Sequence, residues 1–283
     1  MTVAAAGAYA YWQDVRFPAH SMRVAGLPID LRVQDGVRPD ELAAIRRGLR
    51  VTDRFMTRVL GRTVHRHVEA RVARSNGCRP FQSPGEAIVG EADRGFLCVD
   101  TASPAWQWLM LKDRAAAIAA AGHEYVHVLQ AEIGCLHSPL EERYRWMIEG
   151  MAEEVSWQAL VAAHDVTPAS VERRIREDGA LDPNLEPLQR YEVDSGRDPE
   201  YTLWHLAVRH LLARAVAAGA APAGRPELAL RGFCGRVAAR TPWRVAFARS
   251  FGIPVRRFYG VFETWRATAQ TRAASTGADW RSR

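Results

Sequence analysis

The chain contains, at residues 120–130, the stretch Ala120-Ala121-Gly122-His123-Glu124-Tyr125-Val126-His127-Val128-Leu129-Gln130. It carries a His-Glu-x-x-His pattern within an alanine-rich segment that favours a helix, and the helix is predicted to stop at Gly134. On a helix His123 and His127 lie one turn apart on the same face, so their imidazoles can converge on one metal ion with Glu124 beside them. Two imidazoles supply two of the three protein ligands that a catalytic zinc ion needs. The alternative is an amphipathic core helix with two partly buried histidines.

A second stretch, further along the chain, offers a third ligand. It reads Trp146-Met147-Ile148-Glu149-Gly150-Met151-Ala152-Glu153-Glu154 and lies in a segment that predicts a helix over residues 141–164. Glu149 is its best ligand candidate. Glu153 shares a helix face with Glu149, so it can accept the free N–H of a ligating imidazole. Glu154 points elsewhere and is predicted to be a solvated acid. A solvated helix face is the alternative for Glu149 and Glu153 as well.

These two stretches resemble the gluzincin metallopeptidases, in particular the peptidase MA-like proteins, whose second helix carries a Trp-hydrophobe-x-Glu-Gly-x-Ala-Glu pattern. The resemblance implies a zinc ion with three protein ligands, His123, His127 and Glu149. It also implies that Glu124 acts as general base and then as proton shuttle, and that Glu153 orients a ligating imidazole. The implied fold is α+β and zincin-like, with a small twisted sheet over the motif helix and a mainly helical C-terminal half.

A hydrolase of this kind also needs a hydrogen-bond donor for the oxyanion that forms when water adds to a carbonyl, and gluzincins use Tyr or His for it. Tyr201 is the first candidate, with Tyr191 and His205 as the alternatives, and a purely structural role stays open for each. In the relatives, the helix that starts with this Tyr has a small residue three positions later. This chain has Trp204 there, a departure that is expected to narrow or reshape the pocket.

The resemblance spans residues 40–266 and reaches a closing helix-turn-helix that is expected over residues 246–262. It implies a zinc-dependent hydrolase that cleaves an amide, above all a peptide bond, through a metal-activated water. The Gly-x-Met-Glu-Asn sequence with which related aminopeptidases hold a free N-terminus is absent, so exopeptidase specificity has no support. Two alternatives stay open: a metal-dependent enzyme of small-molecule metabolism with a non-peptide substrate, and a non-catalytic binding protein of zincin fold.

Composition and charge fit a globular protein without a nucleic-acid partner. The chain has 283 residues, of which 48% are hydrophobic and 25% charged, so it can bury a sizeable core. Its formal net charge of +6 comes from arginines spread along the sequence, and Lys112 is the only lysine. This diffuse positive charge comes without a basic motif, so no nucleic-acid partner is expected.

The sequence predicts a cytoplasmic protein without a membrane partner. Residues 1–12 are apolar but lack a positively charged start, so they make no convincing signal peptide, and no apolar run is long enough to cross a bilayer. The cysteines form no C-x-x-C pair; they are Cys78, Cys98, Cys135 and Cys234. In a reducing cytoplasm they are expected to be buried thiols, whereas a bridge between Cys78 and Cys98 is open if the protein is exported.

The chain is predicted to have three parts. Residues 1–38 form an N-terminal extension with a short strand, residues 39–266 form a zincin-like metallopeptidase domain, and residues 267–283 form a polar tail. Within the domain, residues 39–135 carry the sheet and the motif helix, and residues 136–266 form the helical half.

Local patterns place the elements that lead to the motif helix. A helix is predicted over residues 39–60, with proline at its first position and acids in its first turn. Residues 64–72 alternate like a strand, and the opposite, valine-rich face is expected to be buried, so His65 and His67 are expected to be solvated rather than a second metal site. In zincins an edge strand pairs with the extended substrate, which makes residues 88–99 the expected substrate-binding wall.

Overall fold

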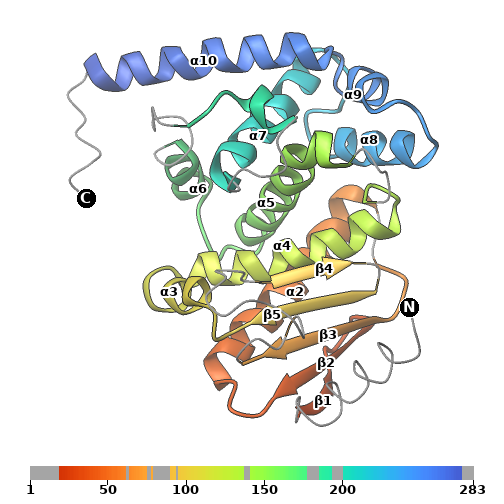
Figure 1. Cartoon of the computed structure of the whole chain (residues 1–283), viewed down its shortest axis with the longest axis vertical. Helices are drawn as coiled ribbons and strands as arrows, with labels where there is room; N and C mark the ends of the chain where they lie inside the picture. The colour runs from red at the N-terminus through yellow and green to blue at the C-terminus, as the bar shows by residue number, and fades with distance from the viewer. Residues whose placement is uncertain are drawn as a thin grey trace. The chain divides into compact units, whose positions relative to one another are not determined.

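A computed structural model gives the structure of the chain, which has an α+β fold (Figure 1). Its contacts divide it into two compact units, residues 1–54 with 63–129, and residues 55–62 with 130–283. The structure describes residues 19–61, 64–74, 78, 90–93, 95–136, 141–176, 185–192 and 200–275. The combination of a small sheet with many helices confirms the α+β class that the sequence predicts.

The sheet belongs to the first unit. Its strands among the described residues are β1 (Ala19–Arg23), β2 (Ile29–Gln34), β3 (Val68–Ala73), β4 (Gly90–Asp93) and β5 (Phe96–Asp100). Their order is β1-β2-β3-β5-β4, in which β2, β3 and β5 run parallel while β1 and β4 pair antiparallel with their neighbours. β4 is therefore an edge strand, and it lies within the segment predicted to border a substrate. Residues 88, 89 and 94 of that segment lie outside the described residues.

The third strand confirms one part of its prediction and corrects another. Val68 and Val72 are buried on the predicted face, and His65 and His67 are exposed. The strand begins at Val68, however, four residues later than its alternating pattern predicts. Val68 donates its N–H to the carbonyl oxygen of Pro28 at 2.9 Å. Because Pro28 has no N–H of its own, the ladder between β2 and β3 cannot extend past this point.

Three of the described helices begin in the first unit: α2 (Pro39–Leu60), α3 (Pro104–Lys112) and α4 (Arg114–Glu132). α2 has the predicted bounds and is followed by Gly61 at φ +60°. α4 is the predicted motif helix. Its first turn is capped by Asp113, whose Oδ1 accepts the N–H of Ala116 at 3.0 Å, and Gly134 follows its end at φ +82°.

α2 and α4 cross at a glycine. A Cβ atom at Gly48 of α2 would collide with the carbonyl oxygen of Ile118 and would lie 3.1 Å from the backbone nitrogen of Gly122. Gly122 directly precedes His123. The two backbones can approach this closely only because Gly48 has no side chain, so this crossing fixes the position of the motif helix within its unit.

The second unit is helical in all of its described elements. They are η1 (Glu141–Tyr144), α5 (Arg145–Ala162), α6 (Pro168–Ile175), η3 (Leu188–Glu192), α7 (Tyr201–Ala217), α8 (Leu228–Ala238), α9 (Trp243–Phe251) and α10 (Val255–Ser275). This confirms the predicted helical C-terminal half. α9 and α10 form the expected closing helix-turn-helix, with Gly252 in the left-handed conformation at φ +70° between them. α10 continues through Ser275, into the segment that is predicted as a polar tail over residues 267–283.

An aromatic cluster joins α5 to α10 inside the second unit. Trp146 of α5 stacks on Phe258 with the ring planes 8° apart, and its Nε1 donates a hydrogen bond to the hydroxyl of Tyr259 at 3.2 Å. Burial raises the pKa of Tyr259, and the Glu192 carboxylate raises it further. The Tyr259 hydroxyl therefore stays protonated. The aromatic spacing of this region is core packing, as the sequence predicts.

Both pairs of cysteines form disulfides, which overturns the prediction of buried thiols. Cys78 pairs with Cys98 on β5 at a Cα–Cα distance of 5.4 Å, and Cys135 pairs with Cys234 on α8 at 4.6 Å. The four cysteines of the chain are thus all paired. Such pairing needs Cα atoms within about 7 Å, which is a property of the tertiary structure and not of the spacing.

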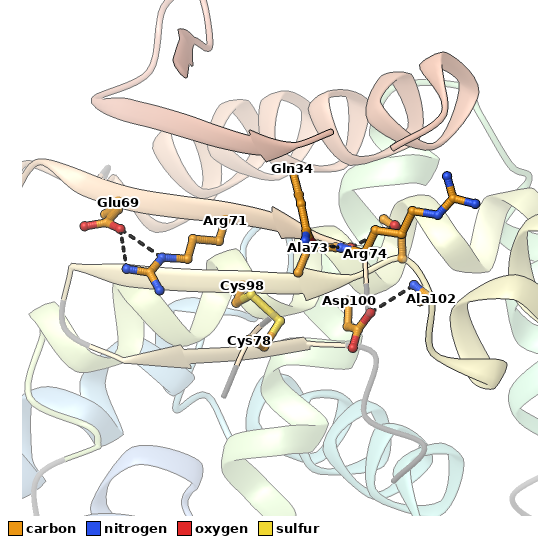
Figure 2. The surroundings of a disulfide bond; sticks show 10 residues. Gln34, Glu69, Arg71, Ala73, Arg74, Cys78, Cys98, Asp100 and Ala102 are labelled. Atoms are coloured by element: carbon orange, nitrogen blue, oxygen red, sulfur yellow. Dashed lines mark hydrogen bonds and ion pairs between the residues drawn. A yellow bond between two sulfur atoms is a disulfide. The ribbon is translucent and has the colours of Figure 1, made fainter. Parts of the chain in front are cut away.

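Figure 2 shows the Cys78–Cys98 disulfide beside the sheet strands. On β3, Arg71 donates from Nε and Nη2 to Oε1 of Glu69, at 2.9 and 2.7 Å. The Arg71 guanidinium also lies 5.2 Å from the centre of the Phe96 ring. This face of the sheet is therefore covered by a disulfide, an ion pair and an aromatic ring.

Among the helices that the structure describes, none is long and apolar enough to cross a membrane.

Candidate metal centre

α4 carries the two histidines of the motif. His123 and His127 are buried, and their Nε2 atoms lie 2.9 Å apart. The two rings meet edge to face, with an angle of 81° between their planes. The spacing of four residues on a helix thus brings both imidazoles to one point, as the sequence predicts.

The short distance between the two Nε2 atoms restricts their protons. Two N–H groups cannot face each other at 2.9 Å, so at least one Nε2 carries a lone pair. If both carry lone pairs, each ring holds its proton on Nδ1 and a cation is needed between them. A divalent metal such as zinc would accept both lone pairs, so the chemistry of the two nitrogens fits a metal site.

Glu149 on α5 completes a group of possible metal ligands. One ligand atom from each of His123, His127 and Glu149 lies within 4.8 Å of the other two. The Glu149 side chain is 13% exposed, and its Oε1 lies 3.6 Å from Nε of Arg145, one turn earlier on the helix. Two imidazole nitrogens and a carboxylate oxygen suit a catalytic zinc site, and other divalent metals also accept this set. The donor set therefore fits the predicted metal without identifying it.

A buried hydrogen bond ties the end of α4 to α5 next to these residues. Gln130 donates from Nε2 to the carbonyl oxygen of Ile148 at 2.9 Å, and its side chain is fully buried. Gln130 lies one turn after His127, and Ile148 directly precedes Glu149. The bond therefore joins α4 to α5 one turn after His127 and directly before Glu149. The sequence contains no signal that assigns this role to Gln130.

Two further acids lie beside the ligands. Glu124 follows His123 on α4 and is buried. Glu153 lies one turn after Glu149 and accepts a hydrogen bond from Nε1 of Trp157 at 3.1 Å, which fixes one of its carboxylate oxygens. The bond that the resemblance implies between Glu153 and a ligating imidazole stays a prediction.

Glu154 is not the solvated acid that the sequence predicts. It is 4% exposed, its Oε2 lies 2.8 Å from Nε2 of His205, and the same oxygen lies 3.6 Å from Nε of Arg209. Both partners belong to α7. The prediction failed because it took the chemistry of α5 alone, whereas a second helix packs on this face and supplies the groups that pair with a buried carboxylate.

The candidates for an oxyanion donor gather around one tryptophan. Tyr201 begins α7 and is 40% exposed, while Tyr191 is buried. Their rings meet the ring of Trp204 at centroid distances of 5.6 and 5.5 Å. The third candidate, His205, already uses its Nε2 for the bond to Glu154. Trp204, the residue that departs from the gluzincin pattern, thus contacts both tyrosines.

Comparison with known proteins adds no family to these observations. No protein-family model matches the chain, and a search of curated proteins gives no match either. The resemblance to gluzincins therefore stays a prediction from the sequence motifs.

Proposed function

We propose that this protein is a zinc-dependent hydrolase of zincin-like fold that cleaves an amide, above all a peptide bond. The observation that supports the proposal most is the convergence of ligand atoms from His123, His127 and Glu149 within 4.8 Å, with Glu124 next in sequence to the first of them. A closed structural zinc site needs no adjacent base and has a fourth protein ligand. The described residues give this group three ligands and a neighbouring carboxylate.

The three ligands would hold the metal through Nε2 of each histidine and a carboxylate oxygen of Glu149. Bound zinc would polarise the substrate carbonyl and acidify a water molecule. Glu124 then takes a proton from the attacking water at its carboxylate and passes that proton to the leaving nitrogen, so one residue serves as base and then as acid. Burial of Glu124 keeps this proton transfer away from bulk water.

The remaining residues bind or orient. Glu153 orients a ligating imidazole from its position one turn after Glu149, with its other bond to Trp157 holding the carboxylate in place. The hydroxyl of Tyr201 donates to the developing oxyanion, and Tyr191 is the alternative donor. The edge strand β4 leaves one side without a neighbouring strand in the described sheet, and an extended peptide can pair there as an added strand.

Metal content and cleavage test this function together. Elemental analysis of the purified wild type should find one zinc per chain, and Glu149→Ala should lose most of it because one of three ligands is gone. Glu124→Gln should keep the zinc and lose cleavage of a peptide library, because the amide has nearly the same shape but cannot take up a proton.

Each result separates one part of the proposal from the others. A well-folded wild type that takes up no zinc, even when zinc is supplied, would overturn the metal site. Zinc without cleavage of any peptide would leave the site standing and point to a non-peptide substrate or to a binding protein. Retention of zinc in Glu149→Ala would remove Glu149 from the ligand set.

A further inference from the structure

α5 and α7 approach each other closely at Gly150, next to the proposed ligand Glu149. A Cβ atom at Gly150 would lie 2.5 Å from the carbonyl oxygen of Trp204 and 2.7 Å from Cγ2 of Val208. The two helix backbones are therefore in direct contact at the residue that follows Glu149. Any sliding or rotation of α5 against α7 moves the Glu149 side chain with it.

A polar contact joins the same two helices one turn further along. Glu154 lies four residues after Gly150, on the same face of α5, and its Oε2 meets Nε2 of His205 at 2.8 Å. Both side chains are almost fully buried, at 6% and 1% exposure. The imidazole donates its Nε2 proton to the carboxylate. α5 is thus attached to α7 at two points, one that sets the distance and one that is directional.

Three further charged residues surround this bond: Arg209 supplies a positive charge, whereas Glu172 and Glu227 are acids. Nε of Arg209 lies 3.6 Å from the same oxygen of Glu154, and Nη1 of Arg209 lies 3.4 Å from Oε2 of Glu172 on α6. Glu227 also interacts electrostatically with Glu154, and its pKa is raised, mainly by burial. A buried carboxylate that has these partners adds little to stability over an apolar pair, but it can specify how two helices meet.

We propose that His205 is a positioning residue for the metal centre. Through its bond to Glu154 it fixes the rotation and register of α5 against α7, and it thereby holds Glu149 where a metal ligand is needed. Apolar side chains at the same places would let the helices slide, because apolar contacts have no preferred direction. This inference rests on the proposed function, since it assumes that Glu149 binds the metal.

Three variants of the full chain test the proposal. Glu154→Leu with His205→Leu replaces the polar pair by apolar residues, a change that buried ion pairs tolerate without loss of stability. His205→Gln retains a side-chain N–H for Glu154. His210→Leu is the matched control, because His210 belongs to the same helix but contacts the rings of Phe258 and Phe262 on α10. The measurements are the zinc dissociation constant, by competition with a chromogenic chelator, and amide hydrogen exchange of metal-free α5.

We expect the double variant to fold and to bind zinc about 10–100-fold more weakly than the wild type. Losses of this size are typical when a residue that orients a metal ligand is replaced. His205→Gln and His210→Leu should stay within about threefold of the wild type. A folded double variant with unchanged zinc affinity, or His205→Gln as weak as the double variant, would overturn the proposal.

Hydrogen exchange keeps this test separate from the proposed function. A wild type that binds no zinc contradicts the function and not the attachment of α5. In that case the metal-free proteins still test whether His205 holds α5 against α7. Loss of the bond should speed amide exchange along α5 in the double variant, whereas His210→Leu, which keeps the bond, should exchange like the wild type. Equal exchange in all of these proteins would overturn the role of His205.

Discussion

The two helices that carry the proposed ligands are held in different ways. α4 meets α2 at Gly48, a residue of the neighbouring helix, and Tyr125 adds a hydrogen bond to Oδ1 of Asp53 at 3.1 Å. α5 meets α7 at Gly150, which belongs to the ligand helix and directly follows Glu149. A shift of α4 moves both histidines together and leaves their mutual distance unchanged. A shift of α5 moves Glu149 alone, so the third ligand depends more on packing than the first two.

A disulfide at the end of α4 gives the largest expected effect. Cys135 pairs with Cys234 across 99 residues, and its backbone N–H bonds to the carbonyl oxygen of Gln130 at 2.8 Å. Replacing both cysteines by serine should lower the free energy of unfolding by about 4–5 kcal/mol, because the unfolded chain regains the freedom of a long loop. Urea unfolding without reductant measures this loss.

The second disulfide is the control for the first. Cys78 and Cys98 are only 20 residues apart, and their replacement should cost about 3 kcal/mol by the same loop argument. It should also leave zinc binding unchanged, whereas loss of the Cys135 bridge should weaken it. Four free thiols in the denatured, unreduced wild type would contradict both bridges. Disulfides persist mainly under oxidising conditions, so these bridges run against the reducing surroundings from which the sequence predicted free thiols.

The two glycine crossings come next in size. Gly48→Ala and Gly150→Ala should each lower the free energy of unfolding by about 2–3 kcal/mol, because the new methyl group meets backbone that cannot move aside. The two variants should differ in zinc affinity. Gly150→Ala displaces Glu149, so it should weaken zinc binding more than Gly48→Ala does. Equal zinc affinity in the two variants would break the comparison between α4 and α5.

A third glycine controls for the change in helix propensity. Gly235 lies within α8, and a Cβ atom there would have no heavy atom within 4 Å. Gly235→Ala should therefore stabilise the protein by about 0.5–1 kcal/mol, since alanine loses less backbone freedom on folding than glycine. If Gly235→Ala also destabilised the protein, the losses of stability in Gly48→Ala and Gly150→Ala could not be assigned to the close contacts between helices.

The contrast between α4 and α5 also explains what the sequence could predict. The i, i+4 histidines depend only on helix geometry, so the pattern was sufficient to place them together. The bounds of α2 followed from local signals as well, with proline at its start and glycine after its end. By comparison, Glu149 was predicted as a ligand only from the resemblance to the gluzincin motif. Sequence spacing alone does not show that two helices lie side by side.

The errors fall where distant segments meet. Glu154 is buried because α7 supplies His205, and no property of α5 reveals that partner. The Cys135–Cys234 bridge joins segments far apart in sequence, and the start of β3 depends on the proline that precedes the neighbouring strand. Each of these facts belongs to packing, whereas hydrophobic periodicity and capping signals are local.

The smallest expected effect concerns His210, the second histidine of α7, and the dependence of stability on pH. Burial lowers the pKa of His210 from 6.5, and the positive charge of Arg214 lowers it further. The unfolded chain therefore binds a proton at His210 more readily than the folded protein does. As the pH falls below the unfolded value, the unfolded state takes up more protons and the stability of the folded protein decreases.

His210→Phe should remove this loss, because a phenyl ring does not titrate and fits among the rings of α10 that His210 contacts. Relative to the wild type, the variant should therefore be more stable at about pH 5.5 than at about pH 7.5, as urea unfolding at the two values can measure. A relative stability that is the same at both values would show that His210 does not titrate in this range. His210→Phe should change stability at low pH and leave zinc affinity at neutral pH unchanged. Replacement of His205, which faces α5, should instead affect zinc binding.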